Sequence, residues 1–274
     1  MSVVSVQEAP PRKASYLACE DLLNPMPSGS DLKVIHVATP RKSYKTDVVV
    51  ISDIHLGSEV SRTRDLRRAL AQFYPFRRLI ILGDLFENLD FSSLTRSHYR
   101  LIEDIRRFAA PRSGITVDWI EGNHDETARD IIPWMLGVNA HRELFLDLYG
   151  KSYLFIHGHQ FDDFLNNHPV ISTLASNVYE AVQRREGHAK NLSRWLKRSS
   201  KEWLKVCAKI EHRAVKYAAG RRVDYVLCGH THYFDADTRV EGGGIQYLNT
   251  GCWTDSPATL TTIGPEGARR HLFH

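Results

Sequence analysis

Long apolar runs are missing from this 274-residue chain, and none approaches the roughly 18 residues that a transmembrane helix needs. Its beginning, MSVVSVQEAPPRKASYLACEDLL, lacks the apolar stretch of a secretory signal, so we expect no export. Cysteine is scarce as well: there are four, and no two of them form a CxxC pair. This excludes a zinc knuckle and a dense disulfide framework, and it favours the reducing cytoplasm.

What the chain does contain is typical of a globular protein, with 42% hydrophobic and 25% charged residues. Residues 1–45 are rich in proline and scattered polar residues, which is typical of an extended N-terminal arm or of a disordered tail. The apolar patterning that builds a core begins after this arm. We therefore expect one large domain at 46–274.

Positive charge is concentrated in a single stretch. Residues 164–222 hold 13 Lys/Arg and 4 Asp/Glu, a net charge of +9, whereas the whole chain has a net charge of +4. Apolar residues recur within the stretch at helical steps, with lysines and arginines between them; they are Trp195, Trp203, Val206, Ile210, Ala214 and Tyr217. The pattern predicts a basic amphipathic helical insert. Two interpretations stay open: a stripe that packs on the domain, or a lid beside the site that also touches an anionic membrane.

Strand-like and helix-like segments alternate at the start of the domain. Strands are predicted at 47–53, 78–84 and 115–123, and helices at 62–73 and 97–110. This order implies right-handed crossovers and a parallel sheet. Segments from residue 143 onward read as more antiparallel, beginning with a hairpin at 143–159. The fold class that we expect is α/β, a two-sheet mixed β-sandwich flanked by helices.

Polar clusters follow five of the strand-like runs. They are Asp53-Ile54-His55, Gly83-Asp84, Gly122-Asn123-His124-Asp125, His157-Gly158-His159 and Gly229-His230-Thr231-His232. All of them offer oxygen or imidazole nitrogen and none offers thiolate, which suits Mn, Fe, Zn or Co. A pair of divalent ions needs a ligand that touches both, and the carboxylate of Asp84 is the natural candidate. A water or hydroxide held between the ions would then act as a nucleophile near neutral pH.

The order DxH, GD, GNHD, H and GHxH resembles the calcineurin-like metallophosphoesterase superfamily over about residues 47–255. The resemblance implies a first metal held by Asp53, His55 and His232, and a bridge at Asp84. It implies a second metal held by Asn123, His157 and His230. It also implies catalytic roles for two neighbouring residues: His124 contacts the substrate phosphate, together with Asn123, and protonates the leaving oxygen, while Asp125 orients the ring of His124.

Two neighbours of the expected ligands are ambiguous. His159 could replace His157 as the ligand, or it could hydrogen-bond a ligand; His157 is preferred because it directly follows the apolar run YLFI. Glu87 comes three residues after Asp84. We interpret it as a carboxylate that starts a helix or supports a ligand, rather than as a metal ligand.

A narrower resemblance concerns the substrate. The segments SDIHLG, GDLFE, HGHQFD and YLNTGCWTDSPATLTTI, with a helical insert before GHTH, resemble the UDP-2,3-diacylglucosamine pyrophosphohydrolase branch. Those enzymes act in lipid A synthesis, typically with Mn, and release UMP and a lipid phosphate. The chain departs from that branch by carrying His124 where its members usually have Arg, and by its N-terminal arm.

The leading hypothesis is therefore a Mn-dependent hydrolase of a nucleotide-linked lipid or a similar phosphorylated substrate, in the cytoplasm and peripheral at the inner membrane. The alternative is a general phosphodiesterase, phosphatase or nuclease of the same superfamily. Nucleic acid is the weaker expectation, because the aromatic residues of the insert lie on its apolar face and offer no base-stacking platform. A non-catalytic scaffold would predict missing ligands, and all seven are present.

Overall fold

The computed structural model describes residues 44, 46–162, 201–233, 239–241 and 244–274. Almost all of the expected N-terminal arm, and residues 164–200 of the expected insert, lie outside the described residues. Trp195 of the predicted stripe is among the latter. No helix of the described part is long and apolar enough to cross a membrane.

Six strands form the first sheet, in the order β11-β10-β1-β2-β3-β4. Four of these strands are parallel to one another: β1 (Thr46–Ile51), β2 (Phe76–Leu82), β3 (Thr116–Ile120) and β4 (Asn139–His141). β10 (Ala258–Gly264) runs antiparallel to β1, and β11 (Gly267–Phe273) closes a hairpin with it. The connecting helices are α1 (Thr63–Phe73), α2 (Arg96–Ala109) and α3 (Ile131–Leu136).

Five strands form the second sheet, in the order β5-β6-β7-β9-β8. The expected hairpin is present as β5 (Glu143–Leu148) and β6 (Lys151–Ile156). β7 (Tyr225–Cys228) and β9 (Ile245–Asn249) continue parallel to β6, and β8 (Arg239–Glu241) is antiparallel at the edge. The predicted mixed two-sheet α/β fold is therefore confirmed.

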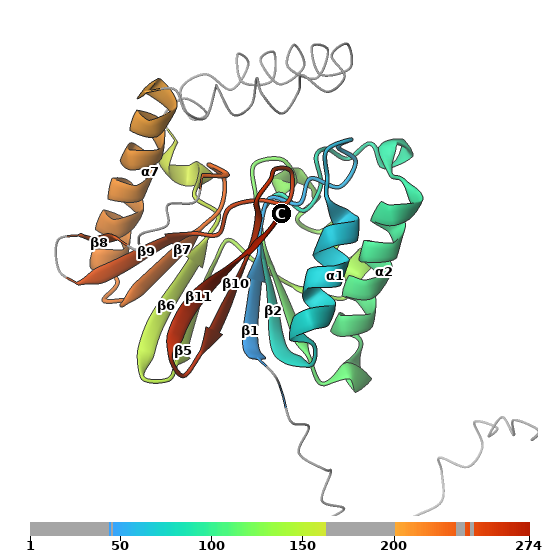
Figure 1. Cartoon of the computed structure of the whole chain (residues 1–274), viewed down its shortest axis with the longest axis horizontal. Coiled ribbons are helices and arrows are strands. Elements are labelled where there is room, and N and C mark those ends of the chain that lie inside the picture. The colour runs from blue at the N-terminus through green and yellow to red at the C-terminus, as the bar shows by residue number, and fades with distance from the viewer. Residues whose placement is uncertain (1–43, 45, 163–200, 234–238, 242–243) are drawn as a thin grey trace, which may run out of the picture. The chain divides into compact units, whose positions relative to one another are not determined.

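The alternation of side chains along the strands explains why the sheets stack. In β1, Val48 and Val50 lie in a core cluster shared with Tyr153 and Phe155 of the second sheet. Val49 and Ile51 face the opposite way, into a second cluster under α1 and α2. Figure 1 shows the resulting layers, with α1 and α2 outside one sheet and α7 (Lys201–Ala219) outside the other.

Helix α7 covers the outer face of the second sheet. Ile210, Ala214 and Ala218 are buried, and Ala214 and Ala218 belong to a cluster with Leu154 and Val226 of β6 and β7. Lysines of the same helix, such as Lys209, are exposed. For this part of the insert, the structure agrees with the interpretation of a packed stripe with solvated lysines. The lid interpretation depends on residues outside the described part.

Candidate metal centre

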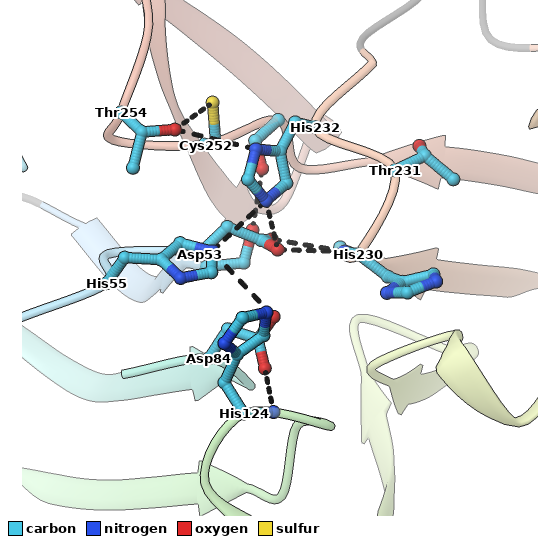
Figure 2. Close-up of polar contacts among 12 residues, drawn as sticks. Asp53, His55, Asp84, His124, His230, Thr231, His232, Cys252 and Thr254 are labelled. Carbon is cyan, nitrogen blue, oxygen red and sulfur yellow. Dashed lines mark hydrogen bonds and ion pairs between the residues drawn. The ribbon is translucent and has the colours of Figure 1, made fainter. Parts of the chain in front are cut away.

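The expected site residues lie just beyond the ends of five strands. β1 ends two residues before Asp53, β2 two before Asp84, β3 three before Asn123, β6 directly before His157 and β7 two before His230. Because β1, β2 and β3 are parallel to one another, as β6 and β7 are, each set presents its carboxyl ends at one edge of its sheet. Figure 2 shows residues of both sets turned toward one another. The predicted strands ended later, at 53, 84 and 123, and the backbone explains the difference.

Most of the expected ligands have a left-handed backbone. The residues with positive φ are Asp53 (51°), His55 (51°), Asp84 (47°), His230 (65°) and His232 (54°). Such angles cost an L-residue roughly 1–2 kcal/mol each, so they persist only where the surroundings impose them. They end the strands early and turn the side chains out of the sheets into one space.

One group of ligand atoms joins Asp53, His55 and His232, all within 4.8 Å of one another. Nε2 of His232 lies 3.1 Å from Oδ1 of Asp53 and 3.2 Å from Nε2 of His55. The carboxylate of Asp53 is fully buried and also accepts hydrogen bonds from the backbone N–H of His230. Three donor atoms therefore converge on one point, as the assignment of the first metal requires.

A second group joins Asp84, His157 and His230. Nδ1 of His157 lies 2.8 Å from the carbonyl oxygen of Leu82, which leaves Nε2 facing Oδ2 of Asp84 at 3.3 Å. The same oxygen lies 3.8 Å from Nε2 of His55. Asp84 therefore stands between the two groups, where a bridging ligand belongs.

The charges around Asp84 suit that position. Burial alone would raise the pKa of its carboxyl, but the imidazoles of His157 and His124 hold this pKa well below the usual range. Burial alone would likewise lower the pKa of His157, and Asp84 raises it to about 9. In the absence of metal the imidazole of His157 thus carries a proton that a cation would replace.

Several polar atoms test whether the residues fit two cations. Oδ1 of Asn123 is buried and has no hydrogen-bond partner within the described part of the chain, whereas the buried Nε2 of His157 has only the carboxylate of Asp84 beside it, at 3.3 Å. Unpaired buried atoms of this kind cost free energy unless something binds them. Nε2 of His157 belongs to the second group of candidate ligand atoms, and the side chains of the expected ligands offer only oxygen and nitrogen. The residues present therefore fit two divalent ions.

Close approach around Asp84 depends on glycine. A Cβ on Gly122 would lie 2.2 Å from Oδ1 and 2.3 Å from the backbone N of Asp84. A Cβ on Gly83, whose φ is +82°, would lie 2.1 Å from Nδ1 of His157. The absence of a Cβ at these two positions therefore permits the close approach of the loops around Asp84.

His124 lies beside the centre, but its orientation has another cause than expected. Nδ1 of His124 lies 2.8 Å from the backbone carbonyl of Glu87, and its backbone N–H donates to Oδ1 of Asp84. The carboxylate of Asp125 instead accepts hydrogen bonds from the backbone N–H groups of Leu85, Phe86 and Gly122, at 2.6, 3.2 and 3.0 Å. The expectation that Asp125 orients the ring of His124 is therefore wrong. Asp125 ties the loop after β3 to the loop after β2.

The ambiguity between His157 and His159 is resolved in geometry. His159 belongs to neither group of ligand atoms, and its Nε2 lies 3.7 Å from Oε2 of Glu126. Burial, with His157 and His230 nearby, lowers the pKa of His159 to about 3, so its ring is neutral. His159 therefore lies beside His157, and only His157 belongs to a group of candidate ligand atoms.

Residues 46–234 match the family of calcineurin-like phosphoesterases. The chain belongs to this family. The match covers every expected ligand, from Asp53 to His232, together with His124.

Solved structures with detectable similarity are distant. An archaeal phosphodiesterase is 13% identical, with a TM-score of 0.41, over 82% of this chain and 99% of that one. Vps29 of Entamoeba histolytica in complex with Zn is 14% identical, with a TM-score of 0.39, over 82% and 97%. An uncharacterized Streptococcus pneumoniae protein, described as a predicted phosphoesterase, is 17% identical, with a TM-score of 0.35, over 83% and 97%. A search of curated proteins found no match.

Two contacts of this phosphoesterase centre were not expected, and a third agrees with the interpretation of Glu87 as a carboxylate that supports a ligand. Oδ2 of Asp162 lies 3.1 Å from Nε2 of His230, and the hydroxyl of Thr254 lies 3.4 Å from Nδ1 of His232 (Figure 2 draws the latter). The third is the contact of Glu87 with His55. In the sequence, Asp162 is visible only as the end of HGHQFD and Thr254 only as part of GCWTD. Neither segment has a spacing that predicts a contact with a histidine some 20 to 70 residues away.

Proposed function

We propose that this phosphoesterase uses two divalent ions, Mn in the first instance, to hydrolyse the pyrophosphate of a UDP-2,3-diacylglucosamine-type lipid, releasing UMP and the lipid phosphate. The observation that carries the hydrolase chemistry is the position of Asp84, whose Oδ2 lies between Nε2 of His55 and Nε2 of His157. A single carboxylate between two sets of ligands is what a pair of ions sharing one bridge requires.

The proposed ligands are those that the two groups bring together. Asp53, His55 and His232 would hold one ion, and Asn123, His157 and His230 the other, with Asp84 between them. Ions so held would supply positive charge to the phosphoryl oxygens and make a water acidic enough to attack near neutral pH.

The chain itself would handle the proton at the leaving oxygen. Burial alone would lower the pKa of His124, but the negative charges of Asp84 and Glu87 raise it above its ordinary value. With Nδ1 held by the carbonyl of Glu87, the proton for transfer would sit on Nε2. His124 would thus be a general acid whose pKa lies above its ordinary value and whose ring is held in a fixed orientation.

The lipid part of the proposal rests on the segments SDIHLG, GDLFE and HGHQFD and on the basic insert before GHTH. A surface with apolar and cationic residues together suits a substrate with acyl chains and phosphates. It also suits a peripheral position on the anionic cytoplasmic face of a membrane. The packing of α7 limits this role to the part of the insert before Ala214, because Ala214 and Ala218 pack on the second sheet.

The experiment that tests the proposal uses the purified full chain loaded with Mn²⁺. UDP-2,3-diacylglucosamine is supplied in mixed micelles, and UMP is measured over time. Release of UMP that Asp84→Ala abolishes supports the proposal. If UMP is not released while the protein binds Mn²⁺ and hydrolyses another phosphate ester, the lipid assignment is wrong and the hydrolase chemistry stands.

One observation favours a second candidate, a general phosphodiesterase. His124 stands where the lipid branch usually has Arg, and a histidine can donate a proton to a poorer leaving group. Hydrolysis of bis(p-nitrophenyl) phosphate with a kcat/KM above that for the lipid would support this candidate. Binding of DNA or RNA that falls steeply with salt would extend it to a nuclease.

A further inference from the structure

Glu87 contacts two histidines of the centre, one through its side-chain carboxylate and the other through its backbone carbonyl. Its Oε2 lies 2.8 Å from Nδ1 of His55, and its backbone carbonyl lies 2.8 Å from Nδ1 of His124. The two imidazole rings are themselves in edge contact, with centroids 4.8 Å apart. Ligand atoms of all three residues lie within 4.8 Å of one another. A metal ligand and the expected acid therefore share one neighbour.

The side-chain contact bears on the metal because it lies on the far side of the His55 ring. Nε2 of His55 faces Asp84 and His232, so Nδ1 is left for Glu87. A carboxylate at this distance favours the proton on Nδ1 and leaves the lone pair of Nε2 for a cation. It also fixes the rotation of the ring. The side chain of His55 is only 5% exposed, so water cannot take over this role easily.

The backbone around Glu87 is held independently of its side chain. Its N–H donates to the carbonyl of Leu56, and Leu56 forms a β-bridge with Phe86. The carbonyl that meets His124 therefore stays in place when the carboxylate is changed. A substitution at this position separates the two contacts, because it removes only the one to His55.

We propose that Glu87 is a positioning residue that sets the affinity of the first metal position through His55 while its carbonyl orients His124. This inference rests on the proposed two-metal function and adds to it a residue outside the ligand set. The effect is specific to one ion, because the second group, Asp84 with His157 and His230, has its own fixed contacts at Leu82 and Asp162.

A matched control exists in the same loop. Asp90 is also acidic and also makes local hydrogen bonds, to the N–H and hydroxyl of Ser92. It is exposed. Asp90→Ala therefore perturbs the loop and removes one negative charge without touching a histidine of the centre.

The test is calorimetric titration of the metal-free full chain with Mn²⁺, for wild type, Glu87→Gln, Glu87→Ala and Asp90→Ala. We expect Glu87→Ala to weaken one of the two ions by about 10–100-fold and to leave the other unchanged. Glu87→Gln keeps an oxygen near Nδ1 and loses the charge, so its loss should be smaller. Asp90→Ala should match wild type. Circular dichroism and the melting temperature of the metal-free variants verify that they fold, and the near-isosteric Gln variant keeps the test decisive if Ala does not.

The outcomes separate this inference from the proposed function. Unchanged affinity for both ions in Glu87→Gln and Glu87→Ala overturns the inference alone, as does an equal loss at both positions. A wild-type protein that binds no divalent ion overturns the inference and the two-metal function together.

Discussion

His55 and His232 face each other with their Nε2 atoms 3.2 Å apart, in a pocket that also contains the carboxylate of Asp53. Two neutral imidazole nitrogens at this distance would oppose their lone pairs, unless a proton or a cation lies between them. The residues come from opposite ends of the domain, 177 positions apart, and from different sheets. Such a contact is stable when both imidazoles bind the same proton or cation.

Competition between protons and metal follows from this arrangement. The pKa of His157 is raised to about 9, because Asp84 outweighs the opposing effect of burial. A metal needs the neutral imidazole, so below about pH 9 binding must release this proton. We expect the apparent affinity for Mn²⁺ to rise with pH up to about pH 9, and to rise further until about pH 10, because Cys252 and Asp53 raise the pKa of His232 to about 10 against the effect of burial. Titration calorimetry in buffers of different ionisation enthalpy measures both quantities, and affinity independent of pH would contradict the prediction.

Replacing the bridge should affect both ions. Asp84→Asn keeps the shape of the side chain and removes the charge that faces His55 and His157. We expect fewer than two bound ions and a fall in kcat by at least about 10²–10³-fold. Asp118→Asn is the control, since this buried carboxylate contacts Arg78 and His141 instead of the centre. It should lower stability and leave metal content intact; two tightly bound ions in Asp84→Asn would refute the bridging role.

The order and type of the elements could be predicted because the strands carry dense apolar patterns. The run from Val48 to Ile51 is entirely apolar, which predicts a buried strand, and the structure buries all of its residues. The ligand set could be predicted for a related reason. Polar residues that follow such apolar runs at strand ends indicate a binding site. For the clusters GNHD and GHTH, metal binding is the interpretation that explains the residue types best.

Backbone and long-range contacts could not be predicted in the same way. The residue types of Asp53 and His232 do not predict a φ near 50°, because the left-handed backbone is imposed by neighbours distant in sequence. The assignment of Asp125 failed for this reason too. Its partners include backbone N–H groups of a loop 40 positions away. A sequence pattern does not show which backbone groups lie near a given side chain.

The corrected role of Asp125 predicts a loss of stability. In Asp125→Asn, the amide nitrogen cannot accept the hydrogen bonds from Leu85, Phe86 and Gly122, so at least one buried donor is left unpaired. We expect the free energy of unfolding of the metal-free protein to fall by about 1–3 kcal/mol. Urea unfolding measures it. An unchanged unfolding free energy with a large fall in kcat would restore the role of orienting His124.

Because Gly122 lies close to Asp84, we expect one added methyl group at this position to have a large effect on metal binding and stability. Gly122→Ala places a Cβ 2.2 Å from Oδ1 of Asp84, so the bridging carboxylate or the loop must shift. We expect loss of at least one ion and a destabilisation of about 1–3 kcal/mol. Gly264→Ala is the matched control, because its Cβ would meet nothing within 4 Å. Metal content and stability equal to wild type in Gly122→Ala would show that the loop yields freely.

Helix α7 provides a test of whether the end of the insert is a fixed wall. Ile210 is 1% exposed and lies one helical turn before Ala214, which packs on the second sheet, whereas its neighbour Lys209 is exposed. If the stripe belongs to the core, Ile210→Ala should lower the free energy of unfolding by about 2–5 kcal/mol. Lys209→Ala should change it by less than about 0.5 kcal/mol. A helix that instead opened and closed as a unit would lose little stability on Ile210→Ala, and its amide hydrogens would exchange rapidly at both positions. Slow exchange from Cys207 to Ala218 in the metal-free protein, together with the large effect of Ile210→Ala, would confine any lid to the residues that precede this helix turn.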